Sequence, residues 1–269
     1  MMEWLTVIVV GILAGTHTAT WGMYKDAPHE GFRRYPRSIL VSTLVAPIAY
    51  RVIGLDASRI ADMVILWGVT YVTERAITEF YKVYWRTEDQ SKYFIPMQFH
   101  VFGRVVHSRA QRLLIGIPHA AVVIGLLFVI DWIQDSYALP VWVMALTVGG
   151  IGGWISAFGG AWKDAPIEGF EWLKFFRSPV VAGLYALLLT LFTRDFVVIA
   201  LAAEGFTVAT LETYKTFFFP SKPRGKFAGK AVHFPGMLRV RQRFLPLYIL
   251  IWLTVIGGFI NAFLRGEAI

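Results

Sequence analysis

Residues 113–132 read LLIGIPHAAVVIGLLFVIDW, a run in which Asp131 is the only residue with a formal charge. A helix needs about 20 apolar residues to cross the hydrocarbon core of a bilayer. The whole chain has the same character, because 56% of its 269 residues are hydrophobic, 16% are charged and the mean hydropathy is +0.55. The pattern predicts an all-α polytopic membrane protein, since the alternation of a membrane barrel is absent.

Eight segments are expected to span the membrane. The sixth is the weakest, because Arg194 and Asp195 leave it short. The segments are Trp4–Tyr24, Ser38–Leu55, Ile60–Tyr84, Leu113–Trp132, Val141–Trp162, Pro179–Phe192, Phe196–Phe219 and Phe244–Leu264.

Charge asymmetry predicts the orientation of these segments. Most of the 26 Lys and Arg residues lie in the connections after the first, third, fifth and seventh segments. Basic connections stay in the cytoplasm, so both termini are expected outside it. The net charge of +8 then reflects topology and predicts no nucleic-acid partner. The basic inner face is expected to attract anionic lipids.

The chain contains an internal repeat. Residues 25–32, KDAPHEGF, recur as residues 163–170, KDAPIEGF, at an offset of 138. Residues 79–82 and 212–215 share the pattern Glu-x-Tyr-Lys at an offset of 133. We therefore expect two four-helix repeats, residues 1–135 and 136–269. An even number of spans in each gives the two repeats one orientation, related by a pseudo-two-fold axis along the membrane normal.

The first and fifth segments each carry a face of small residues. Such faces allow the backbones of two helices to approach closely in lipid. One hypothesis is that the two helices cross each other on the pseudo-two-fold axis, and the alternative is that each face packs within its own half or on another protomer. The residues are Gly11, Gly15, Thr18 and Gly22, and Gly149, Gly153, Ser156 and Gly160.

The duplicated KDAPxEGF sequence predicts a cytoplasmic turn leading into a short interfacial helix. Lysine suits the end of one helix, while aspartate, proline and glutamate suit the start of the next. A paired site for an ion or a lipid headgroup is the functional alternative. The charged residues of the two copies are Lys25, Asp26 and Glu30, and Lys163, Asp164 and Glu168.

Ionisable groups inside the spans are the leading functional candidates, because burying a charge in lipid is expensive. His17, Glu74 and Glu204 each occur in one half only. The equivalent positions in the other half are Ile155, Thr207 and Tyr71. Arg75 joins them as a candidate, although Glu79 lies one helical turn away and can neutralise it. Glu79 and Glu212 are interpreted as structural partners of the lysines that follow them.

No cofactor or metal site is predicted. The chain has no cysteine, its six histidines lack the spacing of a metal site on a helix, and no catalytic or nucleotide-binding motif lies in a suitable context.

Three classes of function therefore remain. The first is a channel or transporter for a small solute or ion. The second is a non-catalytic subunit or anchor in a larger membrane complex, with a partner subunit or a second copy of the chain. The third is a lipid-headgroup enzyme at the cytoplasmic surface, in which the carboxylates of the duplicated turn act with His100 or His233.

Overall fold

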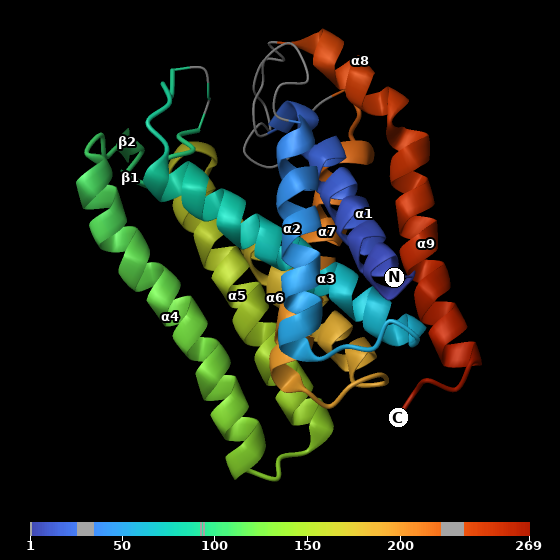
Figure 1. Cartoon of the computed structure of the whole chain (residues 1–269). Helices are drawn as coiled ribbons and strands as arrows, with labels where there is room; N and C mark the ends of the chain where they lie inside the picture. Colours follow the sequence, from blue (N-terminus) through green and yellow to red (C-terminus); the bar gives the residue numbers. More distant parts are fainter. Residues whose placement is uncertain (1, 26–34, 92, 94, 222–233) are drawn as a thin grey trace.

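The protein is a bundle of helices, seen in a computed structural model that describes residues 2–25, 35–91, 93, 95–221 and 234–269 (Figure 1). Within these residues, six helices are long and apolar enough to cross a membrane, which confirms an all-α membrane protein. They are α1 (Met2–Lys25), α4 (Arg109–Ser136), α5 (Val141–Glu168), α6 (Trp172–Leu189), α7 (Phe196–Phe217) and α9 (Leu245–Leu264).

The remaining elements are shorter or more polar. Helices α2 (Tyr35–Ile53) and α3 (Ile60–Phe80) occupy the second and third expected spans, and α3 continues into one turn of π-helix, η1 (Tyr81–Trp85). Strands β1 (His100–Val101) and β2 (Arg104–Val105) pair in an antiparallel hairpin. Helix α8 (Pro235–Arg243) lies across the end of the bundle before α9 (Figure 1).

Both termini lie at the same end of the bundle. Tyr50, near the end of α2, donates a hydrogen bond to Glu3, and Ile269 N donates to Leu191 O at 2.8 Å. The carboxylate of Glu267 accepts from Ala61 N at 2.8 Å, so the C-terminal tail caps the start of α3. The β1–β2 hairpin and α8 lie at the opposite end (Figure 1).

The small-residue faces pack within their own halves. A Cβ added to Gly15 of α1 would lie 2.5 Å from the Cα of Ile39 in α2, and one added to Gly153 of α5 would lie 2.3 Å from the Cα of Pro179 in α6. Gly11 and Gly149 make the same kind of contact with α2 and α6. The hypothesis that α1 and α5 use these faces to cross each other is therefore wrong for the four glycines named here, whereas nothing lies within 4 Å of a Cβ at Gly160.

The second copy of the expected turn is also absent. Helix α5 continues through Lys163 and Asp164 to Glu168, with Pro166 inside it, and ends at Gly169, whose φ is +88°. Pro166 has no N–H to donate to the backbone oxygen four residues earlier, so the last turn of α5 has one hydrogen bond fewer, while glycine accepts a positive φ at no steric cost. Helix α6 then starts at Trp172, seven residues before the expected Pro179.

The two helices that cross at the centre are α3 and α7. Gly68 and Gly205 meet there, because a Cβ added to Gly205 would lie 2.0 Å from the carbonyl oxygen of Gly68. A Cβ added to Gly68 would lie 2.9 Å from the carbonyl oxygen of Ala202. This contact leaves no room for a side chain, so the distance between the two helices depends on both glycines.

Gly205→Ala is therefore expected to destabilise the bundle by about 1–3 kcal/mol, the usual cost of overpacking. Thermal unfolding of the purified protein in detergent measures the effect. Gly257→Ala is the matched control, because nothing lies within 4 Å of a Cβ at that position of α9. Equal melting temperatures of the two variants would contradict the crossing.

Candidate functional site

His17 lies fully buried inside the bundle. Its ring stacks on Tyr248 of α9 at 4.0 Å between ring centroids, and Trp67 and Trp252 contact its edges at 5.5 and 5.3 Å. The Nδ1 atom lies 3.0 Å from the hydroxyl of Tyr71. Nε2 has no hydrogen-bond partner within the part of the chain that the structure describes. Burial among aromatic rings opposes a positive charge on the imidazole.

Tyr71 connects His17 with Arg75. Its hydroxyl accepts a hydrogen bond of 2.6 Å from Trp21 Nε1. The guanidinium of Arg75 lies over the ring of Trp21, 4.9 Å from the centroid. The candidates His17 and Arg75 are therefore linked by direct contacts through Tyr71 and Trp21. His17 and Trp21 belong to α1, and Tyr71 and Arg75 belong to α3.

Glu204 lies elsewhere, between α5 and α7. Its Oε1 accepts a hydrogen bond from the hydroxyl of Ser156. Its Oε2 is buried and has no hydrogen-bond partner among the described residues. The neighbouring surface of α5 is Gly152, where an added Cβ would lie 3.5 Å from Oε2. A buried carboxyl oxygen that has no hydrogen bond costs free energy.

Glu74 is also fully buried, in α3, one residue before Arg75.

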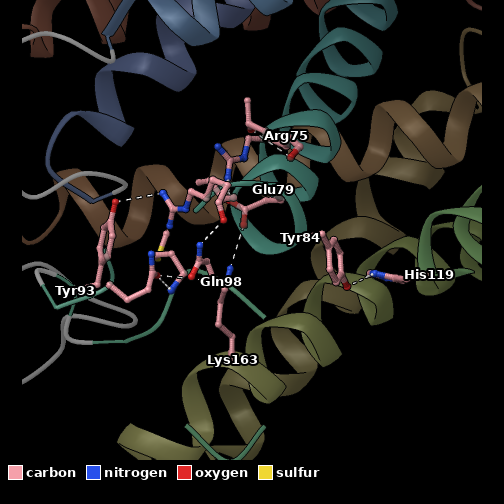
Figure 2. Close-up of polar contacts among 12 residues, drawn as sticks. Arg75, Glu79, Tyr84, Tyr93, Gln98, His119 and Lys163 are labelled. Atoms are coloured by element: carbon pink, nitrogen blue, oxygen red, sulfur yellow. Dashed lines mark hydrogen bonds and ion pairs between the residues drawn. The ribbon is translucent and has the colours of Figure 1, made fainter. Parts of the chain in front are cut away.

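Glu79 holds three cationic side chains at the end of the bundle that carries the hairpin. Lys82 Nζ lies 2.5 Å from Oε1, Lys163 Nζ lies 3.1 Å from Oε2, and Arg75 completes the set with an ion pair to Oε1. Figure 2 shows Lys163 reaching toward Glu79 from α5, with Arg75 on the opposite side. The expected pair of Glu212 with Lys215 forms as well, at 3.0 Å.

Several buried polar residues next to this cluster were absent from the candidates. Arg112 Nη2 donates to the backbone oxygen of Arg86 at 2.7 Å, and the side-chain amide of Gln98 donates to the same oxygen. Tyr84 and His119 form a separate contact at 2.8 Å (Figure 2). The signal for Lys82 was present in the sequence, because Arg75, Glu79 and Lys82 repeat at helical spacing.

The duplicated sequence is described in part. Asp26 and Glu30 lie outside the described residues, and so do the side chains of Lys25 and Glu168. Lys163 pairs with Glu79, and Asp164 Oδ1 is buried without a hydrogen-bond partner among the described residues. His100 lies beside this part of α5, with its ring stacked on Trp162 at 4.9 Å and an interplanar angle of 11°.

The described residues contain no group of three or more His, Cys, Asp and Glu side chains placed to hold a metal ion. Comparisons of the chain with protein-family models, with curated proteins and with solved structures find no match.

His100 makes stability depend on pH. Burial lowers the pKa of His100, and the positive charge of Lys163 lowers it further. An unfolded histidine has a pKa of about 6.5, so the unfolded state binds the proton more tightly. The stability that His100 contributes is therefore present above about pH 6.5 and is lost as the pH falls toward the lower pKa of the folded state.

We expect the melting temperature of the native protein to fall between about pH 7.5 and about pH 5.5. In His100→Gln, which has no titrating ring, the fall over the same interval should be smaller. Comparing the fall in melting temperature of each protein, instead of the melting temperatures themselves, removes the effect of the lost stacking on Trp162. Equal falls in both proteins would show that His100 is not the group responsible.

Proposed function

We propose that the protein is a membrane channel or transporter for a small solute or ion, with Glu204 as a binding group for a proton or cation. The observation that carries the proposal is the buried Oε2 of Glu204, which lacks a hydrogen-bond partner among the described residues. Insertion of a carboxylate near the middle of a membrane helix costs about 2.5–3.5 kcal/mol, and such groups usually mark transport pathways.

The neighbours of Glu204 favour the same role. Gly152 presents no side chain to the carboxyl group, and Ser156 supplies one hydrogen bond. A carboxyl group with one bound and one unbound oxygen is suited to exchange a proton or to take a cation. In the other half, the linked contacts of His17, Tyr71, Trp21 and Arg75 extend from the bundle interior to the Glu79 cluster.

We propose further that residues 1–135 and 136–269 are two parallel four-helix repeats, which makes eight spans. Equivalent packing supports this, since α1 contacts α2 through Gly11 and Gly15 just as α5 contacts α6 through Gly149 and Gly153. The fourth helix of each half also packs on the third helix of the other half, α4 on α7 and α9 on α3.

In the proposed orientation, the basic connections face the cytoplasm and both termini face outward. Anionic lipid would then gather at the end that carries α8 and the hairpin.

Because the chain has no native cysteine, single cysteines labelled with an impermeant maleimide test this topology. We expect Ser58→Cys and Tyr137→Cys, both exposed, to react in intact cells. Arg104→Cys on the hairpin should react only after permeabilisation. Protection of Ser58→Cys together with Arg104→Cys would mean that α2 and α3 do not span the membrane, leaving six spans.

Transport is tested in proteoliposomes that contain a fluorescent indicator for the ion whose gradient is imposed, which is the proton, sodium or potassium. The native protein is expected to raise the flux of at least one of these ions above that of empty liposomes. Glu204→Gln should reduce that flux by about tenfold, because it removes a charge in the pathway without changing size.

Asp135→Asn is the matched control, since Asp135 is an exposed carboxylate in the last turn of α4. Its flux should equal that of the native protein. Flux at the level of empty liposomes for every gradient would contradict ion transport by the chain alone. A second polypeptide in stoichiometric amount in native mass spectra would then favour the subunit alternative.

A further inference from the structure

The end of α3 continues as a charged face beyond the membrane span. Arg75, Glu79 and Lys82 follow one another at i, i+4 and i+7 through α3 and into η1, and Arg86 is the residue with extended backbone that follows η1. At these four positions Glu79 is the only negative group, and Lys163 of α5 adds another cation beside it. Single turns of π-helix such as η1 are rare and often lie at functional sites.

Arg86 differs from the other cations of this face. Its side chain is 3% exposed, which is nearly complete burial for an arginine. Nη1 donates to Glu88 at 3.2 Å and to the hydroxyl of Tyr93 at 3.3 Å. Nε and Nη2 have no hydrogen-bond partner among the described residues. Buried donors of a charged group are expensive to leave without an acceptor.

The position of Arg86 is fixed by its backbone. Its carbonyl oxygen accepts hydrogen bonds from Arg112 and Gln98, and its amide N donates to Tyr81 O at 3.0 Å. The ring of Tyr93 lies against the guanidinium, 5.1 Å from the centroid. A guanidinium held in this way loses little side-chain entropy when it binds a ligand.

The chemistry of the two unsatisfied groups defines the ligand. Nε–H and Nη2–H lie on the same edge of a guanidinium and point in parallel, which is the geometry that binds two oxygens of one oxyanion. We propose that Arg86 binds a phosphate-type oxyanion through this edge. The proposal does not depend on transport.

The surroundings admit two sources of such a phosphate, a lipid headgroup or a free anion. The β1–β2 hairpin follows Phe99, whose backbone N donates to Val83 O of η1 at 2.9 Å. At its tip the side chain of Phe102 is 90% exposed, and Trp85 of η1 is exposed as well. Exposed aromatic side chains at the end of a membrane bundle suit the headgroup region, which favours a lipid phosphate.

Two binding measurements on the full-length protein test the proposal. Native mass spectrometry follows phosphatidylglycerol retained from nanodiscs of phosphatidylcholine and phosphatidylglycerol. Thermal unfolding in detergent measures the shift in melting temperature on adding inorganic phosphate, with chloride at the same ionic strength as the reference. Arg86→Lys keeps the charge and removes the paired donors, so we expect it to weaken binding of the responding probe by about tenfold.

Arg104→Gln is the control, because it removes an exposed arginine from the same end of the bundle. This variant should bind the probe like the native protein. Retained phosphatidylglycerol without a response to inorganic phosphate would assign the site to a lipid headgroup, and the reverse would assign it to a free anion. Either result supports the proposal if Arg86→Lys reduces it.

The native protein alone can overturn the proposal, which guards against a variant that fails to fold. Neither retained phosphatidylglycerol nor a shift with phosphate in the native protein would contradict it. Equal binding by the native protein, Arg86→Lys and Arg104→Gln would do the same, because it would reduce the effect to general attraction between a basic surface and an anion.

Discussion

The close contact between Gly68 and Gly205 is the constraint on which the rest of the bundle depends. It brings the backbones of α3 and α7 into contact at this point. Each of these helices then presents another face to the first helix of its own half, so Tyr71 of α3 meets His17 and Trp21 of α1, and Glu204 of α7 meets Ser156 of α5. The outer helices α9 and α4 cover what remains of α3 and α7.

The two proposed repeats use this shared geometry for different chemistry. At the offset of 133, Tyr71 in one half stands where Glu204 stands in the other. At the offset of 138, Ile155 and Gly159 stand where His17 and Trp21 stand. The carboxyl group of Glu204 thus has neither of the two polar neighbours that surround the hydroxyl of Tyr71. If the two halves are repeats, the unsatisfied Oε2 of Glu204 lies where the second half lacks counterparts of His17 and Trp21.

Periodicity and composition predicted the helices well, because a span must be long and apolar wherever it packs. They did not identify helix partners. The spacing of Gly11 and Gly15 indicates that a backbone approaches closely, and it carries no information about which backbone. The contact turned out to be the next helix along the chain. The pair that crosses at the centre, Gly68 with Gly205, has one glycine on each helix and therefore no spacing to recognise.

Local signals also misplaced the end of α5. Lys163, Asp164 and Pro166 together resemble the end of one helix and the start of another, yet the helix continues to Glu168. Continuation carries Lys163 to Glu79, where the carboxylate compensates its charge. The tertiary ion pair thus agrees with a longer helix, whereas the local preferences for a turn are each small.

The charged end of α3 illustrates a second limit of sequence reasoning. Arg75, Lys82 and Lys163 all reach Glu79, so one carboxylate allows three cations to be withdrawn from water. Arg86 lies after the end of η1, where the backbone is extended, and pairs with Glu88. Nη1 of Arg86 donates to both Glu88 and Tyr93. Nε and Nη2, on the opposite edge of the guanidinium, have no hydrogen-bond partner among the described residues. Two buried donors on that edge without an acceptor among the described residues favour an anion that the chain itself does not supply.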